Sequence, residues 1–182
     1  MGDWFQIIVD REASPGEAER LASEIRDWLA GWGIVQNTMT NCVLGGDGQG
    51  YAPGPEYRQV VDFDHHHNIQ ILKTNGLQIT VGRMVFHPGQ GDYTVSCPKC
   101  HTACVQSEWN KAIGEWNKGQ TGTLYCPICK QSTPITEWTF EPMWGFGNLG
   151  FKFWNWPPLK DDFVSEIGKR LAHRIIVVKG KL

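Results

Sequence analysis

Two short cysteine pairs constrain this chain more than any other feature of its sequence. Cys97 and Cys100 form the first pair and Cys126 and Cys129 the second, each with a proline after the first cysteine. Two turns of this kind supply the four thiolates of a tetrahedral zinc site with little loop-closure cost within each pair. The sequence therefore predicts one zinc ion per chain. Because the protein fills all four ligand positions, we expect this zinc to be structural rather than catalytic.

The paired turns resemble the knuckles of zinc-ribbon and rubredoxin-like domains, and the resemblance covers about residues 93–137. In those families a glycine commonly follows the second cysteine of each turn, whereas this chain has His101 and Lys130 there. The departure argues against a rubredoxin-type iron site and favours zinc. Two alternatives stay open, in which Cys104 or His101 replaces one of the four ligands.

The composition is that of a folded protein, with 41% hydrophobic and 20% charged residues. The first ten residues lack the basic segment of a signal peptide, and no apolar run approaches the roughly 18 residues of a membrane span. We therefore expect a cytoplasmic protein, in which paired cysteines indicate a metal site rather than disulfides. We expect Cys42 and Cys104 to be buried or unreactive thiols.

The charge balance disfavours nucleic acid as a partner. The formal net charge is −2 and the pI is near 6.3, so the chain has no general attraction for phosphate backbones or anionic membranes. Basic residues do gather in 169–181, but with this pI we interpret them as a solvated helix face and strand end.

Hydrophobic periodicity predicts three helices. The first follows Ser14, whose side chain is a good N-cap with Glu17 three residues later, and it ends at Gly33. The second spans 107–118 and accounts for the long gap between the cysteine pairs. The third begins at Asp161 or Asp162 and carries apolar residues at helical spacing.

Short apolar runs predict the strands. These are residues 4–9, 34–44, 77–86 and 174–179. Glycines and prolines in 45–55 predict an exposed loop, which lacks the Gly-Lys-Ser/Thr ending of a phosphate-binding loop. Asn75-Gly76 predicts a tight hairpin turn between strands at 69–74 and 77–86.

These elements predict an α+β fold. We expect a mixed sheet with helices in the N- and C-terminal parts of the chain. Residues 1–92 and 138–182 would form the main domain, and residues 93–137 an inserted zinc-ribbon-like module.

A second group of metal-capable side chains lies in one short segment. Its members are Asp62, Asp64, His65, His66 and His67. An open site of carboxylates and histidines can activate water, so this segment is the basis of an alternative function as a metal-dependent hydrolase. Successive residues of an extended segment point to opposite faces, however, so we rank a solvated turn ahead of a metal site.

Aromatic residues are dense between positions 138 and 156. The candidate partner-binding side chains are Trp138, Trp144, Phe146, Trp154 and Trp156. Rigid rings give a large contact area at low entropic cost and can also stack on nucleic-acid bases. Since glycines interrupt the segment, we expect some rings in the core and a few exposed.

The two ends of the chain resemble those of small uncharacterised bacterial proteins of similar length. The similar segments are the strand at 4–10 and the segment at 173–182. This resemblance implies a bacterial cytosolic protein and supplies no activity. We expect a zinc-stabilised, non-enzymatic protein-binding module of accessory or toxin-immunity type, with another protein as its partner and no membrane. A zinc-ribbon nucleic-acid-binding protein is the other alternative.

Overall fold

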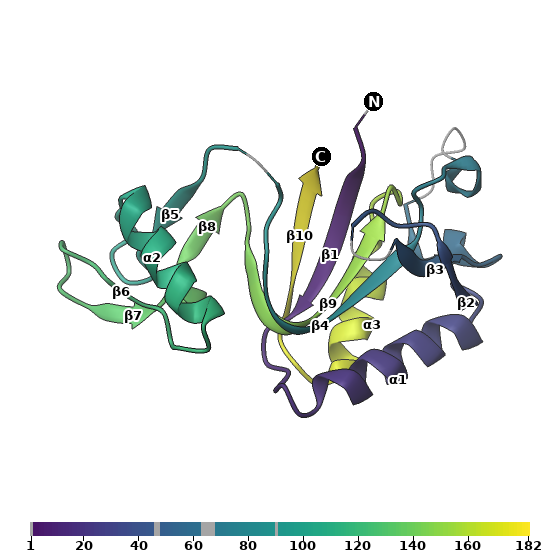
Figure 1. Cartoon of the computed structure of the whole chain (residues 1–182), viewed down its shortest axis with the longest axis horizontal. Helices are drawn as coiled ribbons and strands as arrows, with labels where there is room; N and C mark the ends of the chain where they lie inside the picture. Colours follow the sequence, from purple (N-terminus) through teal and green to yellow (C-terminus); the bar gives the residue numbers. More distant parts are fainter. Residues whose placement is uncertain (1, 46–47, 63–67, 90) are drawn as a thin grey trace.

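The computed structural model describes residues 2–45, 48–62, 68–89 and 91–182. It confirms the α+β fold class (Figure 1). The main sheet has the strand order β10-β1-β9-β4-β3-β2. Its described strand pairs are all antiparallel, whereas we expected a mixed sheet.

The main sheet and the two helices beside it are built from both ends of the chain. They are β1 (Trp4–Asp10), α1 (Ala18–Gly31), β2 (Val35–Asn41), β3 (Gln49–Pro53), β4 (Leu77–Phe86), β9 (Gly145–Trp154), α3 (Asp161–Leu171) and β10 (Ile175–Lys181), with short 3-10 turns at Tyr57–Val60 and Ile69–Ile71. β9 lies between β1 and β4, so the first part of the chain and the segment after the second cysteine pair form one sheet.

Both α1 and α3 cover the same face of the sheet. Leu21, Ile25 and Leu29 of α1 are buried in the core cluster that Phe151 and Phe153 of β9 also join. Their helical spacing gives α1 one apolar stripe, as the sequence predicts. The stripe ends one turn before Trp32, whose exposed fraction is 61%, because the chain leaves the helix at Gly33 with a φ of 69°.

Two predicted loop features are wrong. The segment 45–55 contains β3, in which Gly50 lies so close to Val43 and to the Leu77 carbonyl that a Cβ atom would collide with both. Asn75 and Gly76 form no hairpin turn, because their backbone N–H groups both donate to the carbonyl of Cys42. Contacts with distant residues therefore decide the backbone in both places.

The segment that carries the cysteines lies beside the sheet (Figure 1). It contains β5 (Thr94–Ser96), α2 (Gln106–Asn117), β6 (Thr123–Tyr125), β7 (Ser132–Pro134), a 3-10 turn at Ile135–Glu137, and β8 (Thr139–Glu141). β5 pairs with β8, and β6 with β7. Trp109 and Trp116 of α2 are buried in a separate hydrophobic cluster, as their spacing predicts.

None of the helices that the structure describes offers the length of apolar sequence that a bilayer span requires. The longest helix in the described ranges, α1, has 14 residues and carries an apolar stripe along only one side.

Candidate metal centre

Each cysteine pair sits at the end of a short strand. β5 leads directly into Cys97, and β6 leads directly into Cys126. The two turns then close in the same way, since the His101 N–H donates to the Cys97 carbonyl and the Lys130 N–H donates to the Cys126 carbonyl, each at 2.9 Å. The two knuckles are therefore equivalent in backbone structure as well as in sequence.

The residue after each second cysteine has a left-handed backbone. His101 has a φ of 58° and Lys130 a φ of 62°. This conformation is costly for residues with a Cβ atom, which explains why glycine is common at these positions in similar knuckles. It also lets Cys97 and Cys126 donate their own N–H groups to carbonyls beyond the turn, at 2.9 and 2.8 Å.

The four predicted sulfur atoms converge. The Sγ atoms of Cys97 and Cys129 are 3.7 Å apart, and those of Cys100 and Cys126 are 3.5 Å apart. All four lie within 4.8 Å of one another. Zinc–sulfur bonds of about 2.3 Å in a tetrahedron place the sulfurs about 3.8 Å apart. The four cysteines therefore match the dimensions of a four-thiolate metal site.

The local environment lowers the pKa of some of the four thiols and raises that of others. Hydrogen bonding by Thr102 lowers the pKa of the Cys100 thiol to about 6, and a backbone N–H of the turn also donates to the Cys97 sulfur. At Cys129, the backbone bond from Gln131 favours the thiolate, yet burial and the other three sulfurs raise the pKa to about 12. Four adjacent thiolates repel one another, and a bound cation removes that repulsion.

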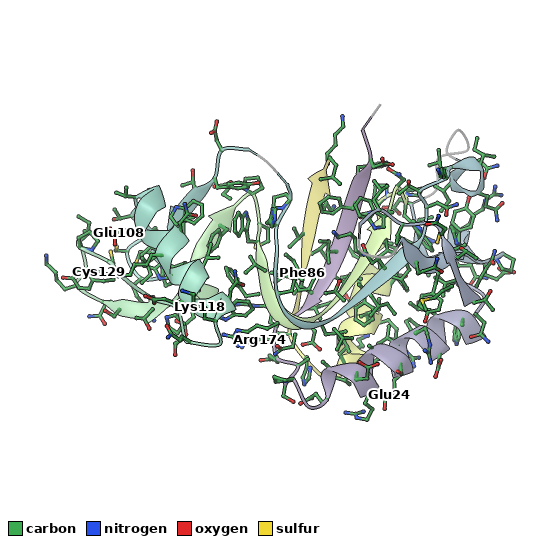
Figure 2. The ribbon with its side chains drawn as sticks, in the orientation of Figure 1. Glu24, Phe86, Glu108, Lys118, Cys129 and Arg174 are labelled. Carbon is green, nitrogen blue, oxygen red and sulfur yellow. The ribbon has the colours of Figure 1, made fainter. Side chains whose placement is uncertain are left out.

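The site is half embedded in the hydrophobic cluster around α2. Cys97 and Cys126 are buried within it, while Cys100 and Cys129 are half-buried toward the surface. Figure 2 shows Cys129 at the end of the molecule away from the six-stranded sheet. In each turn, the first cysteine thus faces the core and the second cysteine faces outward.

The other cysteines and His101 lie outside this group. Neither Cys104 nor His101 belongs to the metal-capable set that the described residues form, and Cys42 is buried just after β2, in the cluster that includes Phe5 and Trp154. Burial, followed by the charge of Glu108, raises the pKa of the Cys104 thiol and disfavours its thiolate. The replacement of a ligand by either residue therefore has no support from the geometry.

The aromatic segment is packed inside the protein. Trp138 and Phe146 are buried in the cluster around α2, Trp154 is buried on one face of the main sheet, and Trp156 is buried on the other. Trp144 is half-buried and stacks on Phe140 with ring centroids 5.0 Å apart. The expectation that a few of these rings are exposed is wrong, because each of the five packs against one of the hydrophobic clusters.

The predicted second metal site cannot be placed. Asp62 is exposed, and Asp64, His65, His66 and His67 lie outside the described residues. Within the described ranges, the four-cysteine group is the one cluster of three or more metal-capable side chains. The hydrolase alternative therefore stays a prediction.

Sequence reasoning missed two residues that support the centre. The Thr102 side chain lies 3.4 Å from the Cys100 sulfur, and a hydroxyl two residues after a cysteine is the signal that could have found it. Arg83 of β4 donates to the carbonyls of Trp116 and Gln120, at 2.6 and 2.9 Å. No local pattern connects β4 with the end of α2, so that contact has no sequence signal.

The chain matches no protein-family model, and comparisons with curated proteins and with solved structures return no significant match. The arguments about function that follow therefore rest on the residues themselves.

Proposed function

We propose that the protein is a zinc-stabilised, non-enzymatic protein-binding module of the cytoplasm, with one structural zinc ion on its four paired cysteines. The observation that carries this proposal is the convergence of four sulfurs from two equivalent turns at near-tetrahedral spacing. Four protein ligands leave no position for water or substrate on the metal. A reducing compartment keeps such thiols available for zinc.

The second cysteine turn supplies the binding surface in this proposal. Tyr125 and Ile128, on either side of Cys126, have exposed fractions of 51% and 63%. Both belong to the hairpin of β6 and β7, which the metal would clamp at its turn. Large side chains held on a rigid hairpin lose little entropy on binding, which favours contact with another protein. An accessory or toxin-neutralising role would use such contact with another protein.

Metal content tests the zinc part of the proposal. Elemental analysis of freshly purified protein should find about one zinc per chain. Cys97→Ser and Cys126→Ser should each lose the metal together with folding of the segment around α2, because structural zinc binding is coupled to folding. Cys42→Ser and Cys104→Ser are matched controls, and both variants should keep the metal. Metal-free protein that is fully folded, or a Cys97–Cys100 disulfide, would refute the zinc site.

Site-specific crosslinking tests the binding part separately. A photoreactive residue at position 128 should crosslink the zinc-loaded protein to one protein partner in the native host, and a charged change at Tyr125 should abolish that product. Val81, an exposed apolar residue of β4, provides the control position for nonspecific crosslinks. A crosslink to nucleic acid at position 128, or equal products at positions 81 and 128, contradicts protein binding and leaves the zinc result standing.

A further inference from the structure

The face of the main sheet opposite α1 and α3 contains a cleft of about 350 Å³. Its lining includes Phe5 of β1, Lys152 of β9, and Gln78 and Thr80 of β4. The segment from Phe86 to Gly89 bounds it where β4 leaves the sheet, near the Phe86 label in Figure 2. A volume of this size lies at the lower end of the range for small-molecule sites in proteins.

Lys152 lies among aromatic rings in this cleft. Its Nζ atom is 4.7 Å from the ring centroid of Phe5 and 4.8 Å from that of Trp154. The strand register places Ile7 and Gln78 on either side of it, so the lysine stands in the middle of three neighbouring strands. Two rings hold the ammonium group in place without neutralising its charge.

The charge of Lys152 has no partner in the described part of the protein. No described carboxylate forms an ion pair with the amine, and the lining residues include no aspartate or glutamate. Burial lowers the pKa of Lys152, and no neighbouring anion opposes that effect. A half-buried cation without a counter-ion is costly, and an anionic ligand would remove that cost.

Neighbouring polar groups can complete a carboxylate site. The Gln78 amide oxygen accepts a hydrogen bond from the Trp154 indole N–H at 3.0 Å, which leaves the amide nitrogen as the donor. The Thr80 hydroxyl lies on the same strand two residues further on, and so faces the same side. Phe5, Met84 and Phe86 supply apolar surface beside these donors.

We propose that this cleft binds a small organic monocarboxylate with an apolar, aromatic body. The carboxylate would contact the Lys152 amine and the Gln78 amide, and the apolar body would lie against Phe5 and Phe86. One charged donor and few polar groups on an apolar lining are typical of small-ligand sites. This inference is independent of the metal centre and of the proposed protein partner.

Phenylacetate and its neutral counterpart phenylacetamide are the probes for the zinc-loaded full chain. Titration followed by NMR should show phenylacetate binding at least about tenfold more tightly, with shifts at β1, β4 and β9, because only the acid pairs with Lys152. The pKa of the Lys152 amine should rise on addition of phenylacetate and stay unchanged with the amide. Equal affinity for the two probes would overturn the proposal.

Variants make the test specific to the cleft. Lys152→Met keeps most of the apolar stem and should reduce phenylacetate affinity to the level of the amide. Lys179→Met removes the same charge from β10 on the opposite face and should change nothing. Gln78→Glu places a carboxylate beside Lys152 and should block phenylacetate even if Lys152→Met folds poorly. Retention of tight phenylacetate binding by either cleft variant would refute the site.

Discussion

At the scale of single residues, His173 links three elements through its ring. Its Nδ1 atom lies 2.9 Å from the buried carboxylate of Asp10, and its Nε2 atom lies 3.5 Å from Glu17. The hydrogen bond to Asp10 raises the pKa of His173, against the opposing effect of burial, and the charges of Asp10, Glu17 and Glu12 raise it further. The protonated ring therefore ties the end of β1 to the start of α1 and of β10.

This arrangement predicts a defined pH dependence. The folded pKa lies above the unfolded value of about 6.5, so the contribution of His173 is fully present below that value. It is lost as the pH rises through the folded pKa. The difference in unfolding free energy between the wild type and His173→Gln, measured with urea, should be largest near pH 6 and shrink toward pH 9. A difference that grows with pH would contradict the charged pair.

The left-handed residue of the second knuckle predicts a stabilising substitution. Lys130 is exposed and has a φ of 62°, so Lys130→Gly relieves backbone strain that exceeds the entropy lost by glycine. We expect a gain of about 0.5–1 kcal/mol in the free energy of unfolding of the zinc-loaded protein. Lys130→Ala, which keeps the strain, is the control. A denaturation midpoint that rises equally for both variants would point to the side chain instead.

At the scale of elements, Arg83 joins β4 to the end of α2. One bond goes to the Trp116 carbonyl in the last turn of α2, which also accepts from the Gly119 N–H, and the other goes to the Gln120 carbonyl just beyond the helix. The guanidinium group of Arg83 lies 4.0 Å from the ring centroid of Trp116. Helix ends leave carbonyls without partners, and positive charge is favourable there. A residue of the main sheet therefore caps a helix of the metal-binding segment.

Loss of this cap should destabilise the protein measurably. We expect Arg83→Gln to lower the free energy of unfolding by about 1 kcal/mol or more, since bonds from a charged donor are stronger than neutral ones. Arg20→Gln removes an exposed ion pair with Glu24 on α1 and should cost less than about 0.5 kcal/mol. Denaturant unfolding measures both. Equal effects would mean that the Arg83 contacts contribute no more than a surface ion pair.

At the scale of the whole molecule, two hydrophobic clusters are built differently. The cluster between the sheet and the two helices contains no metal ligand, whereas the cluster around α2 includes Cys97 and Cys126. Metal removal should therefore act on one part first. This difference gives the proposed division into a main domain and an inserted module at 93–137 a direct test.

Hydrogen exchange after zinc chelation provides that test. We expect amides of α2, β5 and β8 to lose protection while β1, β9 and β10 keep theirs, since the sheet retains its own core. Added zinc should restore the lost protection, which controls for irreversible damage. A simultaneous loss across all strands would show that the chain folds as one unit, in which case the proposed domain division fails.

The local sequence by itself determined the metal-site turns and the apolar face of α2. Cys-Pro-x-Cys turns bring two sulfurs together within four residues, and the helical spacing of Trp109 and Trp116 places both on one face, so neither prediction needs knowledge of the remaining chain. The left-handed backbone at His101 and Lys130 is also a local feature, because the geometry of each turn requires it.

Only the tertiary structure decided the features that depend on distant segments. Gly50 is part of a strand because Val43 and Leu77 approach it, and Asn75-Gly76 bonds to Cys42 instead of forming a hairpin. Trp138 and Phe146 are buried because they pack against α2, and Trp154 and Trp156 are buried because they pack against opposite faces of the main sheet. Burial depends on which surfaces meet in the folded chain, and so does the position of Lys152 between the rings of Phe5 and Trp154. Residues that are neighbours across a sheet can lie far apart in the sequence, so local sequence carries no information about these contacts.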